Sequence, residues 1–484
     1  MAVAGASAAA QSVIAGVHSA IPEAAFHGVA FTATDSARPP LKLPTGPSAA
    51  LVCRDFYSAV NSDWIATTPL PVDTTKDDVV SLAPKRDTIR VDQFFIAQSA
   101  ARATLVKILT AARAVAATTT DPVTRVLGNF YNSCMLTPNP DSVARSKEKD
   151  GGVNRCLNAT DEVLNNALGR AYVNAVSTPA TEARVKAMAE QLRAAMADRI
   201  KKLTWMSPET KNEALVKLAA MRFRVGNPDK GEDYNALHLS PTDFEANKRD
   251  AAYVQYQRDI EKFGAAPDKN TVGIRQYTVN AYYIPNMNAM EIPAVLFQEP
   301  FFNQTADAVE NYAGLGFIVG HEITHAFDTY GSQYDTAGLP HNWWTDADRE
   351  HFLARAQKLV DQYDGFVTLE GVHLGGTRTL DENIADLGGG NLSFEAYMHN
   401  LGKKPESRAG GMTPEQRYFL ALAEAWRAKS GPRFAMHMAH IDSHSPARFR
   451  VNGVIANMPE FAKAFGCKPG DPMVRSPAER AEIW

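Results

Sequence analysis

Hydrophobic positions recur at helical spacing over several long stretches of this chain. Between Thr181 and Leu203, apolar residues three or four positions apart form one stripe, with charged residues between them. The intervals Asp92–Ala117 and Tyr418–Lys429 have similar spacing. We predict a helix over each interval and assign the apolar stripes to a buried core.

Local signals add further elements to this pattern. Ser207, followed by Pro208, is a plausible N-cap for a helix, and a second helix is predicted to begin near Asp346. The run Val279–Ile284 is rich in β-branched and aromatic residues and is predicted to be a strand. The expected fold is therefore mainly α with a small β component.

Composition and charge exclude several classes of protein. The chain has 484 residues, 45% of them hydrophobic and 21% charged, and a formal net charge of −4, as expected for a globular enzyme rather than a nucleic-acid-binding protein. No run of 18 apolar residues predicts a transmembrane span. Residues 1–50 are rich in Ala, Ser and Pro and are predicted to be a flexible leader, because Met1–Ala25 lacks the basic start of a secretory signal.

One short motif carries the chemistry. His321-Glu322-Ile323-Thr324-His325 reads H-E-x-x-H, and on a helix His321 and His325 lie on one face, where both can bind one metal ion. Glu322 lies near enough to act on a water bound to that metal. The alternative is a helix with two surface histidines, but the apolar flanks of the motif favour a buried helix, in which these groups need partners.

A third ligand is needed, because catalytic zinc sites use three protein ligands and one water. Glu382 and Asp386 share one helical face downstream. Glu382 is the predicted ligand. Asp386 is predicted to accept a hydrogen bond from the free N–H of a ligand histidine, preferentially that of His321. The run Gly388–Gly390 that follows is predicted to form a tight turn. In isolation, this carboxylate pair is typical of a solvated acidic face.

These motifs together resemble the neprilysin and endothelin-converting-enzyme family of zinc endopeptidases. The matching segments keep the order of the family and lie at Val279–Tyr283, Ile292–Phe302, Gly320–Asp328, Glu382–Asp386 and His444–Gly453. The resemblance extends from about residue 51 to the C-terminus. It implies a gluzincin-type zinc peptidase domain with one Zn²⁺ per chain.

The resemblance also assigns roles to residues outside the zinc motif. It implies that His444 stabilises the oxyanion of the reaction and that Arg450 contacts the substrate backbone, with Asp442 a candidate to orient His444. Further residues are implied to bind substrate, through the backbone or in a pocket for a bulky apolar side chain: Asn280, Ala281, Phe302, Ile318 and Trp426. Without the resemblance, each of these is an ordinary core, loop or turn residue.

The chain departs from the family between two cysteines. Family members have a long helical lobe that covers the active site, whereas here residues 134–156 form a short polar linker. We therefore divide the chain into a leader (1–50), the N-terminal part of the catalytic domain (51–133), this linker, and the remainder of the catalytic domain (157–484). A naturally lidless variant and an incomplete sequence both explain the short linker.

The four cysteines bear on the compartment. The resemblance implies that Cys53 pairs with Cys467 and Cys134 with Cys156, while both partners of two other family bridges are missing together. This favours an extracytoplasmic, oxidising location. The alternative is four reduced thiols in a cytosolic enzyme.

The expected function is zinc-dependent hydrolysis of peptides or small proteins on the amino side of bulky hydrophobic residues, by Glu322-assisted attack of a zinc-bound water. The alternative is a zinc-bound binding or scaffold protein that is catalytically impaired because it lacks the lid. The natural substrate and the oligomeric state are left open by the sequence.

Overall fold

The structure is a computed structural model of the chain. It describes residues 40–70, 90–139, 150–226, 232–264, 273–369, 371–402 and 409–484. Most of the predicted leader lies outside these ranges. Of residues 40–50, those from Gly46 on belong to the short helix η1 (Gly46–Leu51), and Leu41 packs against the core.

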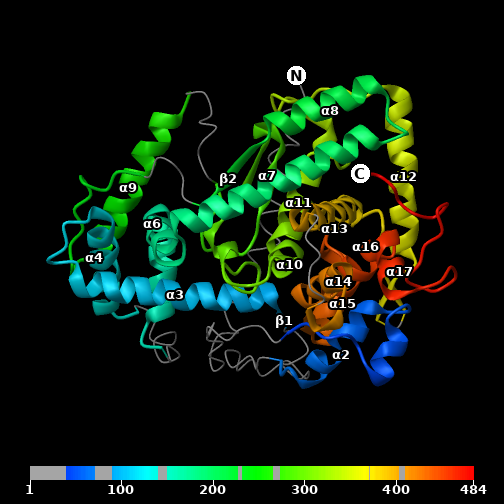
Figure 1. Ribbon diagram of the computed structural model, residues 1–484. Helices are drawn as coiled ribbons and strands as arrows, with labels where there is room; N and C mark the ends of the chain where they lie inside the picture. Colours follow the sequence, from blue (N-terminus) through cyan, green and yellow to red (C-terminus); the bar gives the residue numbers. More distant parts are fainter. Residues whose placement is uncertain are drawn as a thin grey trace.

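Helices dominate the described residues, which confirms the predicted fold class (Figure 1). The helices are α2 (Phe56–Thr67), α3 (Gln93–Val115), α4 (Pro122–Leu136), α6 (Val153–Val176), α7 (Pro179–Lys202), α8 (Pro208–Ala220), α9 (Phe244–Lys262), α10 (Ala308–Asn311), α11 (Phe317–His325), α12 (Asp346–Asp364), α13 (Leu380–Leu401), α14 (Pro414–Ala425), α15 (Pro432–Ile441), α16 (Ala447–Ile455) and α17 (Pro459–Phe465). Among them, no helix is long and apolar enough to cross a membrane.

The strands form three small sheets. The largest has the order β2-β4-β3, in which β2 (Arg222–Val225) runs parallel to β4 (Ala289–Ile292) and β3 (Tyr282–Ile284) runs antiparallel at the edge. The other two sheets are antiparallel pairs, β1 (Arg90–Asp92) with β7 (Ala428–Ser430) and β5 (Val367–Leu369) with β6 (Val372–His373).

Most of the predicted helices are confirmed. The intervals Asp92–Ala117 and Thr181–Leu203 become α3 and α7, with ends shifted by at most two residues. The Ser207 side chain accepts a hydrogen bond from the Thr210 N–H and caps α8 as predicted. Helix α12 begins at Asp346, also as predicted.

Two predicted elements have different bounds from those expected. The helix predicted over Tyr418–Lys429 is wrong at its end, because α14 stops at Ala425 and Ala428–Ser430 pairs with β1 instead. The tyrosine hydroxyl of Tyr57 accepts the Ala428 N–H and fixes this turn. The strand predicted from Val279 begins only at Tyr282, since the Asn280 N–H turns back to the Thr278 carbonyl.

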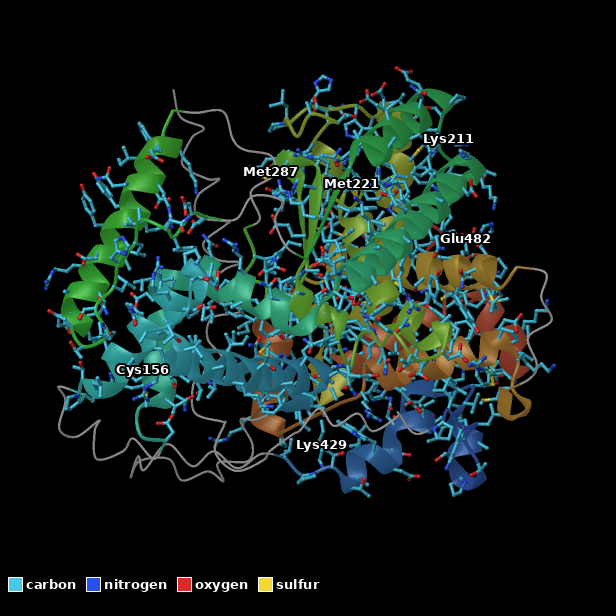
Figure 2. All side chains as sticks on the ribbon, turned by 60° about the vertical axis from the view of Figure 1, so that its left-hand side comes forward. Cys156, Lys211, Met221, Met287, Lys429 and Glu482 are labelled. Atoms are coloured by element: carbon cyan, nitrogen blue, oxygen red, sulfur yellow. A yellow bond between two sulfur atoms is a disulfide. The ribbon has the colours of Figure 1, made fainter. Side chains whose placement is uncertain are left out.

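Figure 1 shows how the elements are arranged. Helices α4, α6 and α9 gather at one end, α12, α16 and α17 at the other, and α7 crosses the middle beside α11 and α13. One continuous hydrophobic core extends through the described residues. The all-side-chain view in Figure 2 shows side chains packed densely between the helices.

Both predicted disulfides are present. Cys53 pairs with Cys467 across 414 residues of sequence, and Cys134 pairs with Cys156 across 22. The second bond joins the end of α4 to the start of α6 and so closes the short connection between them. Residues 140–149 of that predicted linker lie outside the described residues.

Candidate active site

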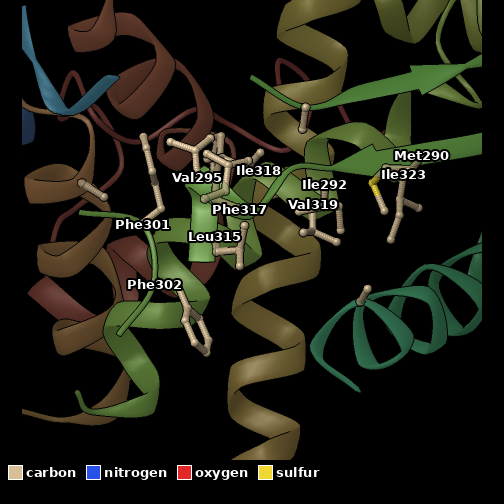
Figure 3. Packing of buried hydrophobic residues seen from close by; sticks show 14 of the residues in the cluster. Met290, Ile292, Val295, Phe301, Phe302, Leu315, Phe317, Ile318, Val319 and Ile323 are labelled. Carbon is tan, nitrogen blue, oxygen red and sulfur yellow. The ribbon is translucent and has the colours of Figure 1, made fainter. Parts of the chain in front are cut away.

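The H-E-x-x-H segment forms the last turns of α11, as predicted. His321 and Glu322 are buried, and the apolar residues of the same helix pack into the core. Figure 3 shows Val319 and Ile323 beside Ile292 and Met290 of β4. Because one side of α11 is fixed by this packing, its opposite side presents the two histidines toward α13.

The glycine run after Asp386 does not form a turn, and that prediction is wrong. Gly388–Gly390 lie inside α13, where it crosses α11. A Cβ on Gly389 would lie 2.7 Å from the Phe317 carbonyl oxygen, and one on Gly388 would lie 2.1 Å from Oγ1 of Thr324. Glycine is required here because the two helix backbones meet, and this close crossing brings Glu382 to the histidines.

The three predicted metal ligands converge. Nε2 of His321 lies 3.0 Å from Nε2 of His325, and Oε2 of Glu382 lies 3.2 Å and 3.5 Å from these two nitrogens respectively. Two imidazoles from one helix and a carboxylate from another thus face one small volume. This donor set, two nitrogens and one oxygen, is one that catalytic zinc sites use.

The hydrogen bonds at Nδ1 of each histidine show whether both Nε2 atoms are free to bind a cation between them. Nδ1 of His321 lies 2.9 Å from Oδ1 of Asp386, as predicted, and Nδ1 of His325 lies 2.6 Å from Oδ2 of Asp328. Since an ionised carboxylate only accepts, each Nδ1 carries the hydrogen and each Nε2 directs a lone pair at the other. Two lone pairs and a carboxylate oxygen at these distances need a cation between them, and the residues therefore fit a metal ion.

The electrostatics of the site favour positive charge. Burial would raise the pKa of Glu382, but the surrounding histidines outweigh burial and hold that pKa well below its usual range. Burial would lower the pKa of His325 and His444, yet Glu382 and a second carboxylate beside each ring raise both, that of His444 to about 9. A site that stabilises protonated imidazoles in this way suits a dication.

The Glu322 carboxylate is held by the edge strand of the sheet. The backbone N–H of Tyr283 donates to Oε2 of Glu322 over 2.8 Å. Tyr283 lies in the middle of β3, so this N–H points away from β4, the strand with which β3 pairs. This contact fixes one carboxylate oxygen of Glu322, Oε2.

His444 and Arg450 both reach the site. Nε2 of His444 lies 3.0 Å from Oε2 of Glu382, and its Nδ1 lies 3.1 Å from Oδ1 of Asp442. Arg450 forms a two-pronged ion pair with Asp386, with Nε and Nη2 at 2.8 Å and 2.6 Å from the two carboxylate oxygens. Arg450 therefore supports the carboxylate that orients His321, in addition to any contact with substrate.

Comparison with known proteins agrees with this geometry. Models of peptidase family M13 match residues 280–481 and, for the N-terminal part of the family, residues 139–228. Together the two ranges span more than half of the chain. The chain belongs to peptidase family M13.

The chain is similar in sequence and structure to several known members of the M13 family. Human membrane metallo-endopeptidase-like 1 is 31% identical over 343 residues, and neprilysin-11 of Caenorhabditis elegans is 34% identical over the same length. These matches cover 68% of this chain but 44% and 40% of the relatives, so the chain spans less than half the length of either protein. The zinc metalloprotease ZMP1 of Mycobacterium tuberculosis in its open state is 36% identical with a TM-score of 0.65, over 69% of this chain and 53% of that one.

In this M13 chain, the residues predicted to bind the substrate backbone lie directly before β3. The Asn280 side chain accepts the Ala281 N–H over 3.0 Å, and Ala281 is buried. Both residues thus lead into the edge strand that holds Glu322. Their contact with substrate stays a prediction.

The predicted apolar pocket is only partly assembled. Arg450 stacks over the Trp426 ring at 4.0 Å, and Phe317, the neighbour of Ile318, packs edge-on against Trp426 at 5.2 Å. Phe302 instead lies beneath Arg184 of α7. Its neighbour Phe301 extends to the opposite side (Figure 3) and joins this aromatic group through Phe94, whose ring lies 5.0 Å from that of Phe301 and 5.4 Å from that of Trp426.

Sequence reasoning gave no role to several residues that hold the ligands. Asp328 follows His325 by three residues, the spacing at which an acidic side chain reaches back to the histidine ring. Asp381 accepts hydrogen bonds from Thr329 N–H and Oγ1 and so connects the turn after α11 to the residue beside Glu382. A signal for Asp328 existed in the spacing, whereas the Thr329–Asp381 contact is set by tertiary packing alone.

Proposed function

We propose that this chain is a zinc-dependent endopeptidase in which His321, His325 and Glu382 bind one Zn²⁺. The observation that carries this proposal is the convergence of these three side chains, each of the two histidines backed by its own carboxylate. Bound there, zinc would polarise the scissile carbonyl and make a water molecule acidic enough to attack it near neutral pH.

Glu322 is the proposed general base and acid. The Tyr283 N–H holds Oε2, so Oε1 accepts the proton from the attacking water and then delivers it to the amine nitrogen of the leaving peptide. The buried position of Glu322 excludes bulk water from this transfer.

His444 is proposed to donate a hydrogen bond to the developing oxyanion. Asp442 holds Nδ1 of His444, and the carboxylates beside the ring keep it protonated near neutral pH. Its Nε2–H, which faces Oε2 of Glu382 in this structure, is the proposed donor to the oxyanion. The His444 ring stacks beside that of His321 with ring centres 6.4 Å apart, and its Nε2 lies 3.0 Å from Oε2 of Glu382, so the proposed donor borders the proposed metal site.

The substrate is proposed to be an extended peptide that lies along the edge strand β3. Asn280 and Ala281 supply backbone and amide groups at the start of that edge, and an extended chain can pair with such a strand. Ile318, Trp426 and Phe301 favour a bulky hydrophobic side chain next to the cleaved bond, and Arg450 lies over the Trp426 ring, whereas Phe302 lies apart from them beneath Arg184.

A second function is favoured by one observation, that Cys134 and Cys156 are only 22 residues apart, where the family resemblance implies a long helical lid. A zinc-binding protein of low catalytic competence would keep the ligands without turnover. If the chain is active, its short α4–α6 connection favours small proteins as well as peptides as substrates. Both disulfides support an oxidising, extracytoplasmic location.

Cleavage of quenched fluorescent peptides tests the proposal. The wild-type chain should cleave them, lose activity on treatment with a chelator, and recover with zinc. Glu322→Gln should bind zinc normally but lower kcat by about 100- to 10,000-fold, and the surface variant Glu245→Gln should match the wild type. Wild-type protein that binds zinc and cleaves no peptide supports the binding-protein alternative instead.

A further inference from the structure

A buried lysine lies under the turn that follows the H-E-x-x-H helix. Lys217 of α8 has 1% of its surface exposed. Its Nζ donates to three backbone carbonyls, those of Ala326 at 2.8 Å, Gly331 at 2.7 Å and Tyr334 at 2.7 Å. Three acceptors that cannot donate require three N–H groups, so this geometry fits the ammonium form.

The surroundings of Lys217 exclude water. Its Nζ lies 5.6 Å from the Phe327 ring centre, 5.7 Å from that of Trp343 and 6.0 Å from that of Tyr283. These distances are those of cation–π contacts. Burial lowers the pKa of Lys217 to about 7, while the charges of Asp328 and Asp335 oppose that change. Burying an ammonium group costs free energy, so a buried lysine with three carbonyl partners indicates a specific structural or functional role.

The three carbonyls belong to the turn that presents Asp328. Ala326 follows His325 directly, at the carbonyl end of α11, where a positive charge is favourable. Gly331 and Tyr334 come from the other side of the same turn. Between them, Asp328 accepts the N–H groups of Tyr330 and Gly331 through Oδ1, and holds Nδ1 of His325 through Oδ2.

The same helix end also supports the base. The Asn288 side chain donates to the Lys217 carbonyl at 3.0 Å and accepts the Tyr283 hydroxyl at 3.0 Å. Tyr283 in turn holds Glu322 through its backbone N–H. Helix α8 therefore connects to a metal ligand through Gly331 and Asp328, and to the proposed base through Asn288 and Tyr283.

We propose that Lys217 is a positioning residue of the zinc centre: its ammonium clamps the turn 326–334, so that Asp328 holds the His325 ring in its metal-binding orientation. This inference rests on the proposed zinc site. It adds a residue distant in sequence that sets the affinity of that site without touching the metal or the substrate.

Zinc affinity measured with a competing chelator tests the clamp. Lys217→Met should weaken zinc binding about 10- to 100-fold, as expected for the loss of a group that orients a ligand. Lys217→Gln, which keeps two donors, should show a smaller loss. Lys211→Met is the matched control, since Lys211 lies on the same helix and its side chain donates to the exposed Lys201 carbonyl, its one side-chain hydrogen bond among the described residues. Figure 2 labels this residue.

Coupling to Asp328 separates positioning from a merely structural role. If Lys217 acts through Asp328, the two substitutions should not add. The zinc affinity of the double variant Lys217→Met/Asp328→Asn should then equal that of whichever single variant binds zinc less tightly. The Co²⁺-substituted Lys217→Met protein should also show an altered visible absorption spectrum, because the ligand geometry changes. Independent, multiplicative losses in the double variant would overturn the proposal.

A wild-type measurement keeps the test valid if the variants do not fold. In protein labelled with ¹³C at lysine Cε, the Lys217 resonance should shift on addition of zinc, and that of Lys211 should stay in place. An unmoved Lys217 resonance, or a Lys217→Met protein that binds zinc as tightly as Lys211→Met, overturns the clamp and leaves the zinc site standing. A wild-type chain that binds no zinc overturns both proposals.

Discussion

Nδ1 of His321 lies 2.9 Å from Oδ1 of Asp386, and Asp386 is itself held by the two nitrogens of Arg450. This relationship fixes the tautomer of His321, so that its Nε2 faces His325 and Glu382. It depends on α13, which carries Glu382 and Asp386 one turn apart on the face that meets α11.

The first prediction follows from this contact. Asp386→Asn should weaken zinc binding about 10- to 100-fold, since the neutral amide no longer favours the Nδ1–H tautomer and leaves Arg450 buried without its ion partner. A chelator-competition titration measures the change. Asp198→Asn, at an exposed pair with Lys201, should leave the affinity unchanged. Equal affinities in both variants would remove Asp386 from its role.

His444 and His325 should be separable, although both lie within 3.5 Å of the same Glu382 oxygen. His444→Gln should keep zinc and lower kcat about 100-fold with little change in KM, as expected for the loss of one oxyanion donor. His325→Gln should lose zinc. Metal content and steady-state kinetics distinguish the two, and loss of zinc in His444→Gln would instead make His444 a ligand.

The helix crossing should tolerate no side chain at Gly389. Gly389→Ala places its Cβ 2.7 Å from the Phe317 carbonyl oxygen and should destabilise the fold by about 1–3 kcal/mol. Gly169→Ala in α6 is the matched control, because its Cβ would meet nothing closer than 3.7 Å and alanine favours a helix by about 1 kcal/mol. Thermal unfolding should therefore show a lowered Tm only for Gly389→Ala.

A pH-dependent contribution to stability is predicted at Asp348. Burial would raise its pKa, but hydrogen bonds from Ser207, Thr210 and Thr345 outweigh burial and lower that pKa from 3.8 to about 2. Since the folded pKa is below the unfolded one, the stabilisation is complete above pH 3.8 and is lost as the pH falls through about 2.

The shift corresponds to about 2 kcal/mol. Asp348→Asn should thus lower Tm most near pH 6, and the gap to the wild type should narrow steadily below pH 4. The exposed neighbour Asp346→Asn should show no such dependence on pH. A gap that stays constant down to pH 2.5 would contradict the assigned role of these hydrogen bonds.

The sequence predicts local features well where periodicity or a short motif determines them. The stripe of α7, the Ser207 cap and the placement of both histidines on one helical face all follow from spacing. The helix predicted over Tyr418–Lys429 failed at its end because pairing with β1, distant in the chain, overrides local propensity.

The glycine run shows the same limit at the site. Glycines beside a motif indicate either a turn or a close contact between backbones, and only the partner helix decides between them. The burial of Lys217 could not be predicted either, because a lysine on an amphipathic helix is usually exposed and its sequence context does not indicate packing under a distant turn. Contacts across the fold, rather than spacing along it, supply the residues that support the ligands.

The most direct measurement is anomalous diffraction at the zinc edge from crystals grown with zinc. We expect one strong peak per chain, within about 2.0–2.2 Å of Nε2 of His321, Nε2 of His325 and a carboxylate oxygen of Glu382. A peak that excludes Glu382, or no peak between the two histidines, would contradict the proposed metal centre and the peptidase function built on it.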